Sequence, residues 1–393
     1  MFTILPIKGY IDQIDGFFCD GIHAGLKSNE KLDMGFIYTK EACTVAALFT
    51  ENRFQAAPLK HFLQYGEDFK TNFVLINSKN ANALTGRKGI ADINTLFSQL
   101  DFELINPVMS STGVIGNPLP MEKLIAGAKR FDLNAKNGEN LSKAIMTTDA
   151  YAKTCMYEVK LSDGSSFKIG AVAKGAGMIN PNLATMLCFI CTDAAASYAD
   201  IKEALKTNSE TTFNAISVDG DTSTNDTVMV LANAKSKAYD KVAFKEALRL
   251  VMHDMAMLMV ADGEGAKKVA AFEVINAATK EQAMIAAKAL SNSLLVKTAL
   301  FGEDPNFGRI ASTIGASQID CDDEKLVISY NDVVVFNKGE ICFDATIEAK
   351  AADVLKKDKY KIICDIGLGE GKFTAYGCDL GYKYVEINAD YRS

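Results

Sequence analysis

The chain has 393 residues, which corresponds to two or three structural units at about 150 residues each. Hydrophobic residues make up 48% and charged residues 23%, so the chain has the composition of a globular protein with a large core. Lysine and arginine number 42 against 49 aspartates and glutamates, and the net charge of −7 argues against nucleic acid or an anionic membrane surface as the main partner.

Short apolar runs bounded by turn-forming residues predict strands along the whole chain. In chain order they cover residues 35–38, 44–49, 73–76, 156–160, 167–173, 186–192, 227–232, 294–300, 325–329 and 360–365. Helical spacing of apolar residues predicts helices over 121–131, over the segment that follows Asp240 and over 281–292. The sequence therefore predicts the α/β (α+β) fold class, with helices packed on sheets.

Two local patterns resemble cofactor or metal sites, but we interpret both as structural elements without a ligand. Residues 367–372 resemble a phosphate loop, but Ile366 replaces the glycine it requires, and the flanking strand-like runs predict a hairpin turn. Cys188 and Cys191 have the spacing of a metal-binding pair, but they lie in an apolar strand and have no second pair. Because the chain has three histidines, a multi-histidine metal centre is not expected. We predict neither a metal nor a cofactor.

The cysteines and the absence of targeting patterns indicate a compartment. Nine cysteines, an odd number scattered along a long chain, predict reduced and mostly buried thiols. The N-terminal segment has no basic region followed by an apolar run of signal-peptide length, and no stretch approaches 18 consecutive apolar residues. We therefore expect no membrane span and a cytoplasmic location.

Polar, small-residue segments interrupt the strand pattern at three places. The central segment is KGAGMINPNLATM at 174–186, and its companions are 110–113 and 218–226. The glycines, proline and asparagines of 174–186 predict a loop that leads into an apolar strand beginning at Thr185. Such a loop is a good place to expose a nucleophile. On composition alone, the three segments are either solvated loops or the walls of a site.

An ordered set of segments carries a resemblance to a known family. The segments are 49–53 with 57–58, 77–83, 110–116, 147–149, 174–187, 218–226, 261–266, 304–310 and 387–393. Together they resemble the ornithine acetyltransferases (glutamate N-acetyltransferases) of arginine biosynthesis, over nearly the whole chain. His23 and Phe307 depart from the family pattern, and neither belongs to the catalytic set; His23 is interpreted as a packing variation.

The resemblance implies a precursor that cleaves its own chain between Ala184 and Thr185. The products would be an α chain of residues 1–184 and a β chain of residues 185–393, assembled as a heterotetramer of two α and two β chains. The implied fold is a layered sandwich similar to the N-terminal-nucleophile hydrolases. An N-terminal Thr185 supplies its own α-amine as the base, with an ordinary pKa of about 7.7–8.0, so acyl transfer does not need a histidine.

The resemblance also assigns the site residues. Thr185 is the nucleophile, and Thr112 and Gly113 stabilise the oxyanion through a hydroxyl and a backbone N–H. The implied substrate contacts, besides Thr185, are Thr148, Lys174, Glu264, Asn388 and Ser393. A lysine suits an α-carboxylate and a glutamate suits an ammonium group. The competing interpretations are a solvated loop lysine for Lys174, a surface carboxylate at a helix end for Glu264 and a disordered tail for Ser393.

The predicted reaction is transfer of the acetyl group from N-acetylornithine to glutamate through an acetyl-threonine. The first alternative is a threonine-nucleophile aminopeptidase or amidohydrolase of the same superfamily, which gives the acyl group to water. The second is a ligand-binding or scaffold protein with an intact chain. Acetyl-CoA as an additional donor is left open, because no residue separates bifunctional from monofunctional members.

Overall fold

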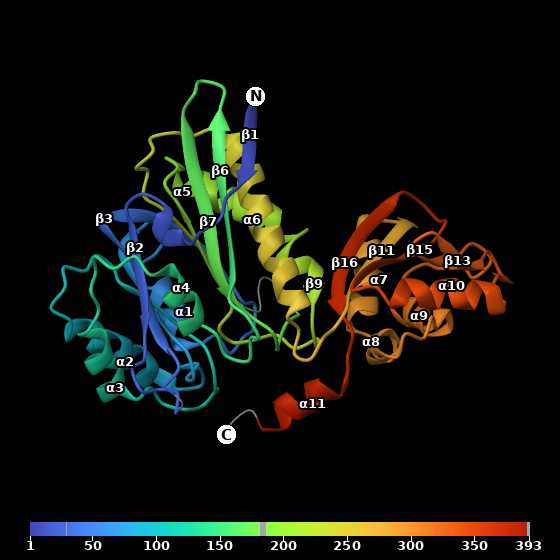
Figure 1. The fold of residues 1–393 in the computed structure, drawn as a ribbon, viewed down its shortest axis with the longest axis horizontal. Coiled ribbons are helices and arrows are strands. Elements are labelled where there is room, and N and C mark those ends of the chain that lie inside the picture. Colours follow the sequence, from blue (N-terminus) through green and yellow to red (C-terminus); the bar gives the residue numbers. More distant parts are fainter. Residues whose placement is uncertain (29, 181–185, 391–393) are drawn as a thin grey trace. The chain divides into compact units, whose positions relative to one another are not determined.

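The computed structural model describes residues 1–28, 30–180 and 186–390. They form two compact units (Figure 1). Unit 1 comprises Met1–Gly175, Pro181–Asn214 and Thr222–Ala256, and unit 2 comprises Ala176–Asn180, Ala215–Asp221 and Met257–Ser393. Each unit thus draws on residues from both sides of the predicted cut. Ala184, Thr185 and Ser393 themselves lie outside the described residues.

Unit 1 is built on a nine-stranded sheet in the order β1-β6-β7-β8-β10-β3-β4-β5, with β2 paired to β3. The strands are β1 (Phe2–Pro6), β2 (Phe17–Ile22), β3 (Met34–Phe49), β4 (Lys70–Asn77), β5 (Val108–Ser111), β6 (Lys153–Leu161), β7 (Ser166–Lys174), β8 (Leu187–Thr192) and β10 (Thr227–Ala232). β8 and β10 are parallel and every one of their residues is buried, which explains their continuous apolar sequences.

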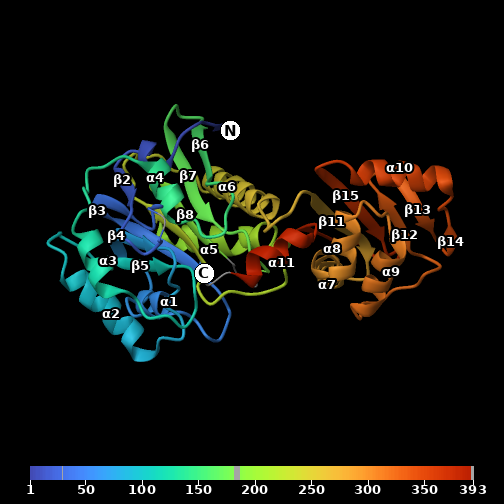
Figure 2. The same cartoon turned by 60° about the horizontal axis from the view of Figure 1, so that its bottom comes forward.

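Helices cover the sheet of unit 1. They are α1 (Ala57–Leu63), α2 (Gly86–Ser98), α3 (Met121–Ala128), α4 (Gly138–Ala144), α5 (Tyr198–Ser209) and α6 (Lys241–Ala261), with 3-10 turns at Ile11–Gln13 and Phe213–Ala215. Figure 2 shows α1, α2 and α3 gathered beside β4 and β5. The part of α6 in unit 1 packs its apolar face on the sheet, where Phe244 contacts Phe167 of β7 with ring centroids 6.3 Å apart.

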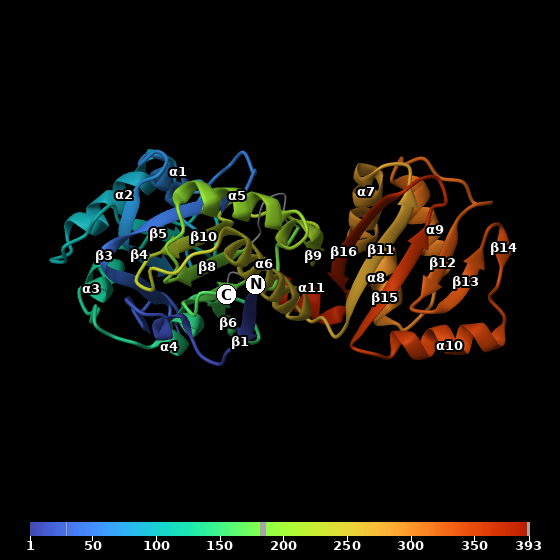
Figure 3. The ribbon, with the colours of Figure 1, turned by 90° about the horizontal axis from the view of Figure 1, so that it is seen from above.

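Unit 2 contains a seven-stranded sheet in the order β14-β13-β12-β15-β11-β16-β9. Its elements are β9 (Ile216–Ser217), β11 (Val269–Ala277), α7 (Lys280–Asn292), α8 (Leu294–Phe301), α9 (Phe307–Ala316), β12 (Val327–Tyr330), β13 (Val333–Asn337), β14 (Glu340–Ile341), α10 (Ala345–Leu355), β15 (Lys359–Asp365), β16 (Gly371–Cys378) and α11 (Tyr382–Ala389). The alanine-rich face of α7 packs closely on β11 and β16 (Figure 3). A single apolar cluster joins α7–α10 to the strands.

The predicted α/β class is confirmed, and most of the predicted elements occur. The strand predicted over 294–300 is wrong, because these residues form the helix α8. Ser293 caps this helix by accepting a hydrogen bond from the Val296 N–H at 3.3 Å, and Val296 and Leu300 place a buried pair at helical spacing. The runs 35–38 and 44–49 belong to one strand, β3, whose register with β4 shifts between Tyr38 and Cys43.

The hairpin expected at 367–372 is also wrong. β15 and β16, which flank this segment, do not pair with each other, because β11 lies between them. β11 runs parallel to β15 and antiparallel to β16. Gly371 fits there because a side chain at this position would collide with the Thr279 carbonyl group. The segment therefore carries the chain across one strand of the sheet.

Within the described residues, no single helix is long and apolar enough to cross a membrane. Only α7 and α8 taken together reach the required length and composition, and the two are bent by 55° relative to each other.

Candidate functional site

The described site residues lie in or next to two polar clusters, one in each unit. In unit 1, Thr112 and Gly113 directly follow β5, which runs parallel to β4 so that Asn77 pairs with Ser111. The carboxyl ends of the two strands therefore meet at one edge. The Thr112 N–H donates to the Asn77 carbonyl at 3.0 Å, and the Ser111 hydroxyl donates to Asn77 Oδ1 at 2.6 Å. These bonds fix the backbone that presents the Thr112 hydroxyl.

Gly113 occupies a position that only glycine can fill. Its φ of +125° lies outside the range that side-chain-bearing residues favour, and a Cβ there would lie 2.2 Å from the carbonyl carbon of Lys79. The next residue, Val114, donates its N–H to the Lys79 carbonyl at 2.9 Å. The loop after β4 and the loop after β5 therefore support each other by backbone contact.

Asn225 joins three of the sequence segments that carry the family resemblance. Its buried side-chain amide donates to the Ala81 carbonyl at 2.6 Å and to the Ser111 carbonyl at 2.8 Å. A buried amide with two good acceptors holds these loops in one arrangement. Residues of 77–83, 110–116 and 222–226 therefore meet in unit 1 as ordered, largely buried loops.

Lys174 lies beside Thr112. It is the last residue of β7, and its ammonium group lies 3.4 Å from the Thr112 hydroxyl oxygen. Lys174 and Thr112 are 9% and 8% exposed, so the interpretation of Lys174 as a solvated loop lysine is wrong. Lys174 pairs with Leu187 at the start of β8. Leu187 is two residues after Thr185 in the sequence.

Thr148 is half-buried and lies between Thr147 and Asp149. The Asp149 carboxylate accepts the Thr147 N–H at 2.9 Å. Burial by itself would raise the pKa of Asp149, but the ammonium groups of Lys174 and Lys153 and the hydrogen bonds outweigh it and lower the pKa to about 2. Asp149 is therefore a carboxylate throughout the physiological pH range. We call Thr112, Asp149, Lys153 and Lys174 the Lys174 cluster.

In unit 2, Glu264 follows the end of α6 by three residues and is 8% exposed. Its N–H donates to the Ala176 carbonyl at 2.9 Å, and its Oε2 accepts the Asn388 amide at 2.6 Å. A Cβ at Gly177 would lie 2.5 Å from the Glu264 carboxylate, so this carboxylate rests against bare backbone. We call Gly177, Glu264 and Asn388 the Glu264 cluster. The interpretation of Glu264 as a surface carboxylate is wrong.

Asp219 fastens the segment Ala176–Asn180 within unit 2. Its carboxylate accepts the backbone N–H groups of Met178 at 2.6 Å and Ile179 at 2.9 Å, and lies 3.3 Å from the Tyr384 hydroxyl. Burial raises the pKa of Asp219 in spite of these backbone donors. Tyr384 is one turn before Asn388 on α11, and its carbonyl accepts the Asn388 amide at 2.9 Å. Asp219 thus links the Ala176–Asn180 segment to the helix that carries Asn388.

The three histidines lie outside both clusters. His23 Nδ1 is 2.9 Å from the Lys31 carbonyl oxygen and 3.3 Å from Asp33 Oδ2. Burial lowers the pKa of His61 and of His253. All nine cysteines are free, and Cys188 and Cys191 are fully buried in β8. Across residues 1–28, 30–180 and 186–390, no group of three or more His, Cys, Asp or Glu side chains is placed to hold a metal ion.

Of the residues proposed from the sequence, the structure brings Thr112, Gly113 and Lys174 together, and Glu264 with Asn388. Sequence reasoning missed the residues that hold them, which are Asn77, Asp149, Lys153, Gly177, Asp219 and Asn225. Most of these lie inside the segments that carry the family resemblance. Their position within a motif was the one signal in the sequence that could have found them. Their hydrogen-bond partners could not be read from the sequence, because these depend on the fold.

Comparison with known proteins identifies the family. The ArgJ family model matches residues 18–393. The chain belongs to the ArgJ family. It is 57% identical to the arginine biosynthesis bifunctional protein ArgJ of Wolinella succinogenes, with all of both chains covered. It is 40% identical to the glutamate N-acetyltransferase of Methanothermobacter thermautotrophicus, with 98% of each chain covered.

A solved ArgJ structure from Bacillus halodurans is 39% identical and covers 50% of this chain and 95% of its own, with a TM-score of 0.48. The ornithine acetyltransferase of Mycobacterium tuberculosis, solved in complex with ornithine, is 30% identical. It covers 46% of this chain and 100% of its own, with a TM-score of 0.39.

Proposed function

We propose that this ArgJ-family chain is a glutamate N-acetyltransferase that moves the acetyl group of N-acetylornithine to glutamate in arginine biosynthesis. The observation that carries the proposal is membership of the ArgJ family over residues 18–393, with relatives similar over their full length. The buried contact between Lys174 and Thr112 supports it, because it places a positive charge that suits an amino-acid carboxylate beside the hydroxyl that we propose as an oxyanion donor.

The first half-reaction acetylates Thr185. The Thr185 α-amine takes the hydroxyl proton while the oxygen attacks the acetyl carbonyl carbon of N-acetylornithine. The carbon–nitrogen bond breaks, and ornithine leaves with its amine protonated by the Thr185 ammonium. The Thr112 hydroxyl and the Gly113 N–H stabilise the oxyanion, and removal of one such donor typically costs about 10²–10³ in rate.

The second half-reaction returns the enzyme to its starting state. The neutral amine of glutamate attacks the acetyl ester and gives up one proton to the Thr185 α-amine; the bond from carbon to the Thr185 oxygen breaks, and the α-ammonium returns that proton to the oxygen, which regenerates the hydroxyl. Holding the amine against the ester replaces a bimolecular encounter, an effect worth up to about 7–11 kcal/mol in model reactions. The same oxyanion donors serve both halves.

The substrate contacts are assigned from the family resemblance and from the charge of each side chain. Lys174 receives an α-carboxylate, and Glu264 receives an ammonium group. Thr148, Asn388 and Ser393 complete the contacts. Self-cleavage between Ala184 and Thr185 creates the N-terminal threonine, and the cleaved chains assemble as two α and two β chains. Acetyl-CoA serves as a second donor; the relatives whose name includes the word bifunctional support a second activity. The free thiols suit the cytoplasm.

The test is an assay of purified protein with N-acetylornithine in the presence and absence of glutamate. We expect steady release of ornithine only with glutamate, and one N-acetylglutamate for each ornithine. Ornithine release that is indifferent to glutamate, with free acetate as the product, would establish the amidohydrolase alternative. Release of CoA from acetyl-CoA with glutamate as the acceptor tests the second donor, and its absence would leave a monofunctional enzyme.

A further inference from the structure

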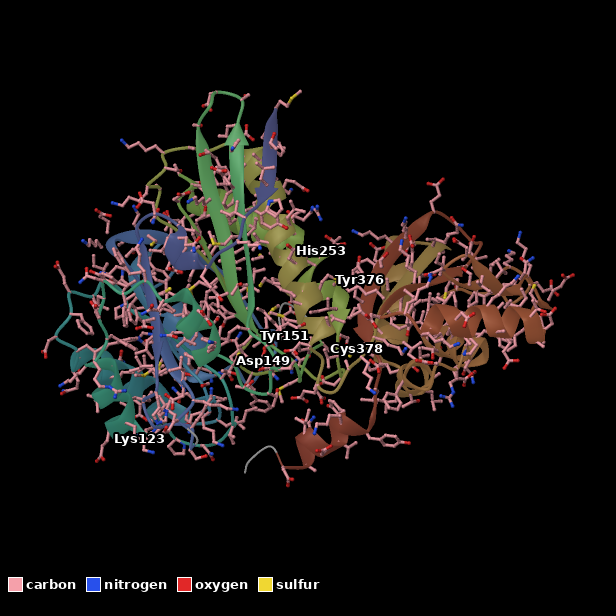
Figure 4. All side chains as sticks on the ribbon, viewed as in Figure 1. Lys123, Asp149, Tyr151, His253, Tyr376 and Cys378 are labelled. Atoms are coloured by element: carbon pink, nitrogen blue, oxygen red, sulfur yellow. The ribbon has the colours of Figure 1, made fainter. Side chains whose placement is uncertain are left out.

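A buried ion pair lies within the Lys174 cluster. Lys153 Nζ is 2.7 Å from Asp149 Oδ1, and both side chains are fully buried. Figure 4 shows Asp149 close to Tyr151, and the Lys153 ammonium lies over the Tyr151 ring, 5.0 Å from its centroid. Burying two charges costs desolvation energy, and an apolar pair of similar size is often equally stable or more so. Stability alone therefore does not account for charges at these two positions.

The Asp149 carboxylate holds the backbone of two site segments. Its Oδ1 accepts the Gly175 N–H at 2.7 Å, and its Oδ2 accepts the Thr147 N–H at 2.9 Å. Gly175 follows Lys174, and Thr147 precedes Thr148. One carboxylate thus fixes the segments that carry two of the proposed substrate contacts.

Lys153 determines what charge the cluster presents. Asp149 lies among two ammonium groups, those of Lys153 and Lys174, so the three together carry one net positive charge. Lys153 forms the direct ion pair with Asp149, whereas Lys174 acts on Asp149 through its charge and has its ammonium group beside the Thr112 hydroxyl. The positive charge that remains available therefore belongs to Lys174, where the cluster borders the oxyanion donor.

We propose that Asp149 and Lys153 are a positioning pair for Lys174: Asp149 fixes the two backbone segments, and Lys153 neutralises Asp149 so that Lys174 keeps its charge for a substrate carboxylate. This inference rests on the proposed function, because it takes Lys174 as a contact for an amino-acid substrate. Asp149 acts on Lys174 and Thr148 through the backbone of their neighbours Gly175 and Thr147.

The test compares Lys153→Met, Asp149→Asn and the double variant Asp149→Asn/Lys153→Met with the wild type. In Lys153→Met, the unpaired Asp149 carboxylate attracts Lys174, so we expect KM for glutamate and N-acetylornithine to rise about tenfold or more, and more than kcat falls. The double variant removes both buried charges together, which restores stability when single variants unfold. We expect it to fold like the wild type and still lose about tenfold or more in kcat/KM.

The matched control is Lys88→Met/Asp92→Asn, which removes an ion pair on α2 with the same four-residue spacing; its charged atoms are 2.6 Å apart and its lysine side chain is 65% exposed. This control should keep wild-type kinetics. A double variant in the Lys174 cluster that folds and turns over like the wild type would overturn the proposal and leave the proposed function intact. A wild-type enzyme that makes no N-acetylglutamate would instead overturn the proposed function and, with it, this inference.

Discussion

Substituting Gly177 by alanine tests the Glu264 cluster without disturbing a hydrogen bond donor or a charge. A Cβ at this position would lie 2.5 Å from Cδ, Oε1 and Oε2 of Glu264, whereas ordinary contacts begin at 3.4 Å. The carboxylate must therefore move by about 0.9 Å. The φ angle of Gly177 is not in the left-handed region, so alanine meets no backbone strain. The moving group is the end of a flexible side chain, and the fold should be preserved.

A shift of this size removes the carboxylate from its 2.6 Å contact with the Asn388 amide and from the proposed substrate ammonium. Misplacement by about 1 Å can cost about 100-fold in rate, so we expect kcat/KM of Gly177→Ala to fall by about that factor. The assay is glutamate-dependent release of ornithine from N-acetylornithine, with a melting curve to establish that the variant folds.

Gly315→Ala is the matched control. It makes the same change within α9 of unit 2, where a Cβ would meet nothing within 4 Å. This variant should keep wild-type kinetics and gain a little stability, because alanine is preferred to glycine inside a helix. A folded Gly177→Ala enzyme with wild-type kcat/KM would refute the placement of Glu264 at the substrate.

Three further predictions concern unit 1 and the proposed cut. Gly113→Ala forces a Cβ against the rigid Lys79 backbone. The rate of acetyl transfer should therefore fall by a factor of about 10²–10³, and the melting temperature should also fall. A wild-type rate would exclude the oxyanion role of Gly113. Thr185→Ala should abolish both cleavage and transfer and leave one band at 42.5 kDa on a denaturing gel; retained turnover would contradict the nucleophile. The pKa of Asp149 is lowered to about 2 in the folded protein, from about 3.9 in the unfolded chain. The ionised carboxylate therefore adds its full contribution to the free energy of unfolding above about pH 3.9, and this contribution is lost as the pH falls through 2. The free energies of unfolding of wild type and Asp149→Asn, measured by denaturant titration, should therefore converge as the pH falls from about 4 to 2. A difference that stays constant over this range would exclude the linkage.

Elements of the fold could be predicted where complete burial of a strand produces a continuous apolar sequence. β8 and β10 are buried throughout and their continuous apolar sequences show it. The 294–300 segment is apolar in the same way, and its helical state depends on the Ser293 cap and on packing against unit 2 strands, which a short apolar run does not reveal. Topology was less accessible, because the insertion of β11 between β15 and β16 joins segments far apart in the sequence.

Some residues of the candidate site could likewise be named from the sequence, and others could not. Thr112, Gly113 and Lys174 could be named because they lie in recognisable segments, and the structure places them together. Asn225 was visible only as a polar residue, because its role depends on two carbonyl groups more than 110 residues away in the sequence. Lys153 reads as an ordinary lysine at the start of a strand, and only its burial against Asp149 shows otherwise. Residues that support a site act through contacts that a linear pattern does not contain.

The central claim is that an acetyl group passes through Thr185, and mass spectrometry of the acetylated enzyme tests it most directly. Purified enzyme is incubated with N-acetylornithine without glutamate, then digested and analysed for peptides. We predict a peptide that begins at Thr185 and carries one added acetyl group, which disappears when glutamate is added and reappears as N-acetylglutamate. A wild-type enzyme that makes N-acetylglutamate while Thr185 remains unmodified, or remains joined to Ala184, would contradict the account.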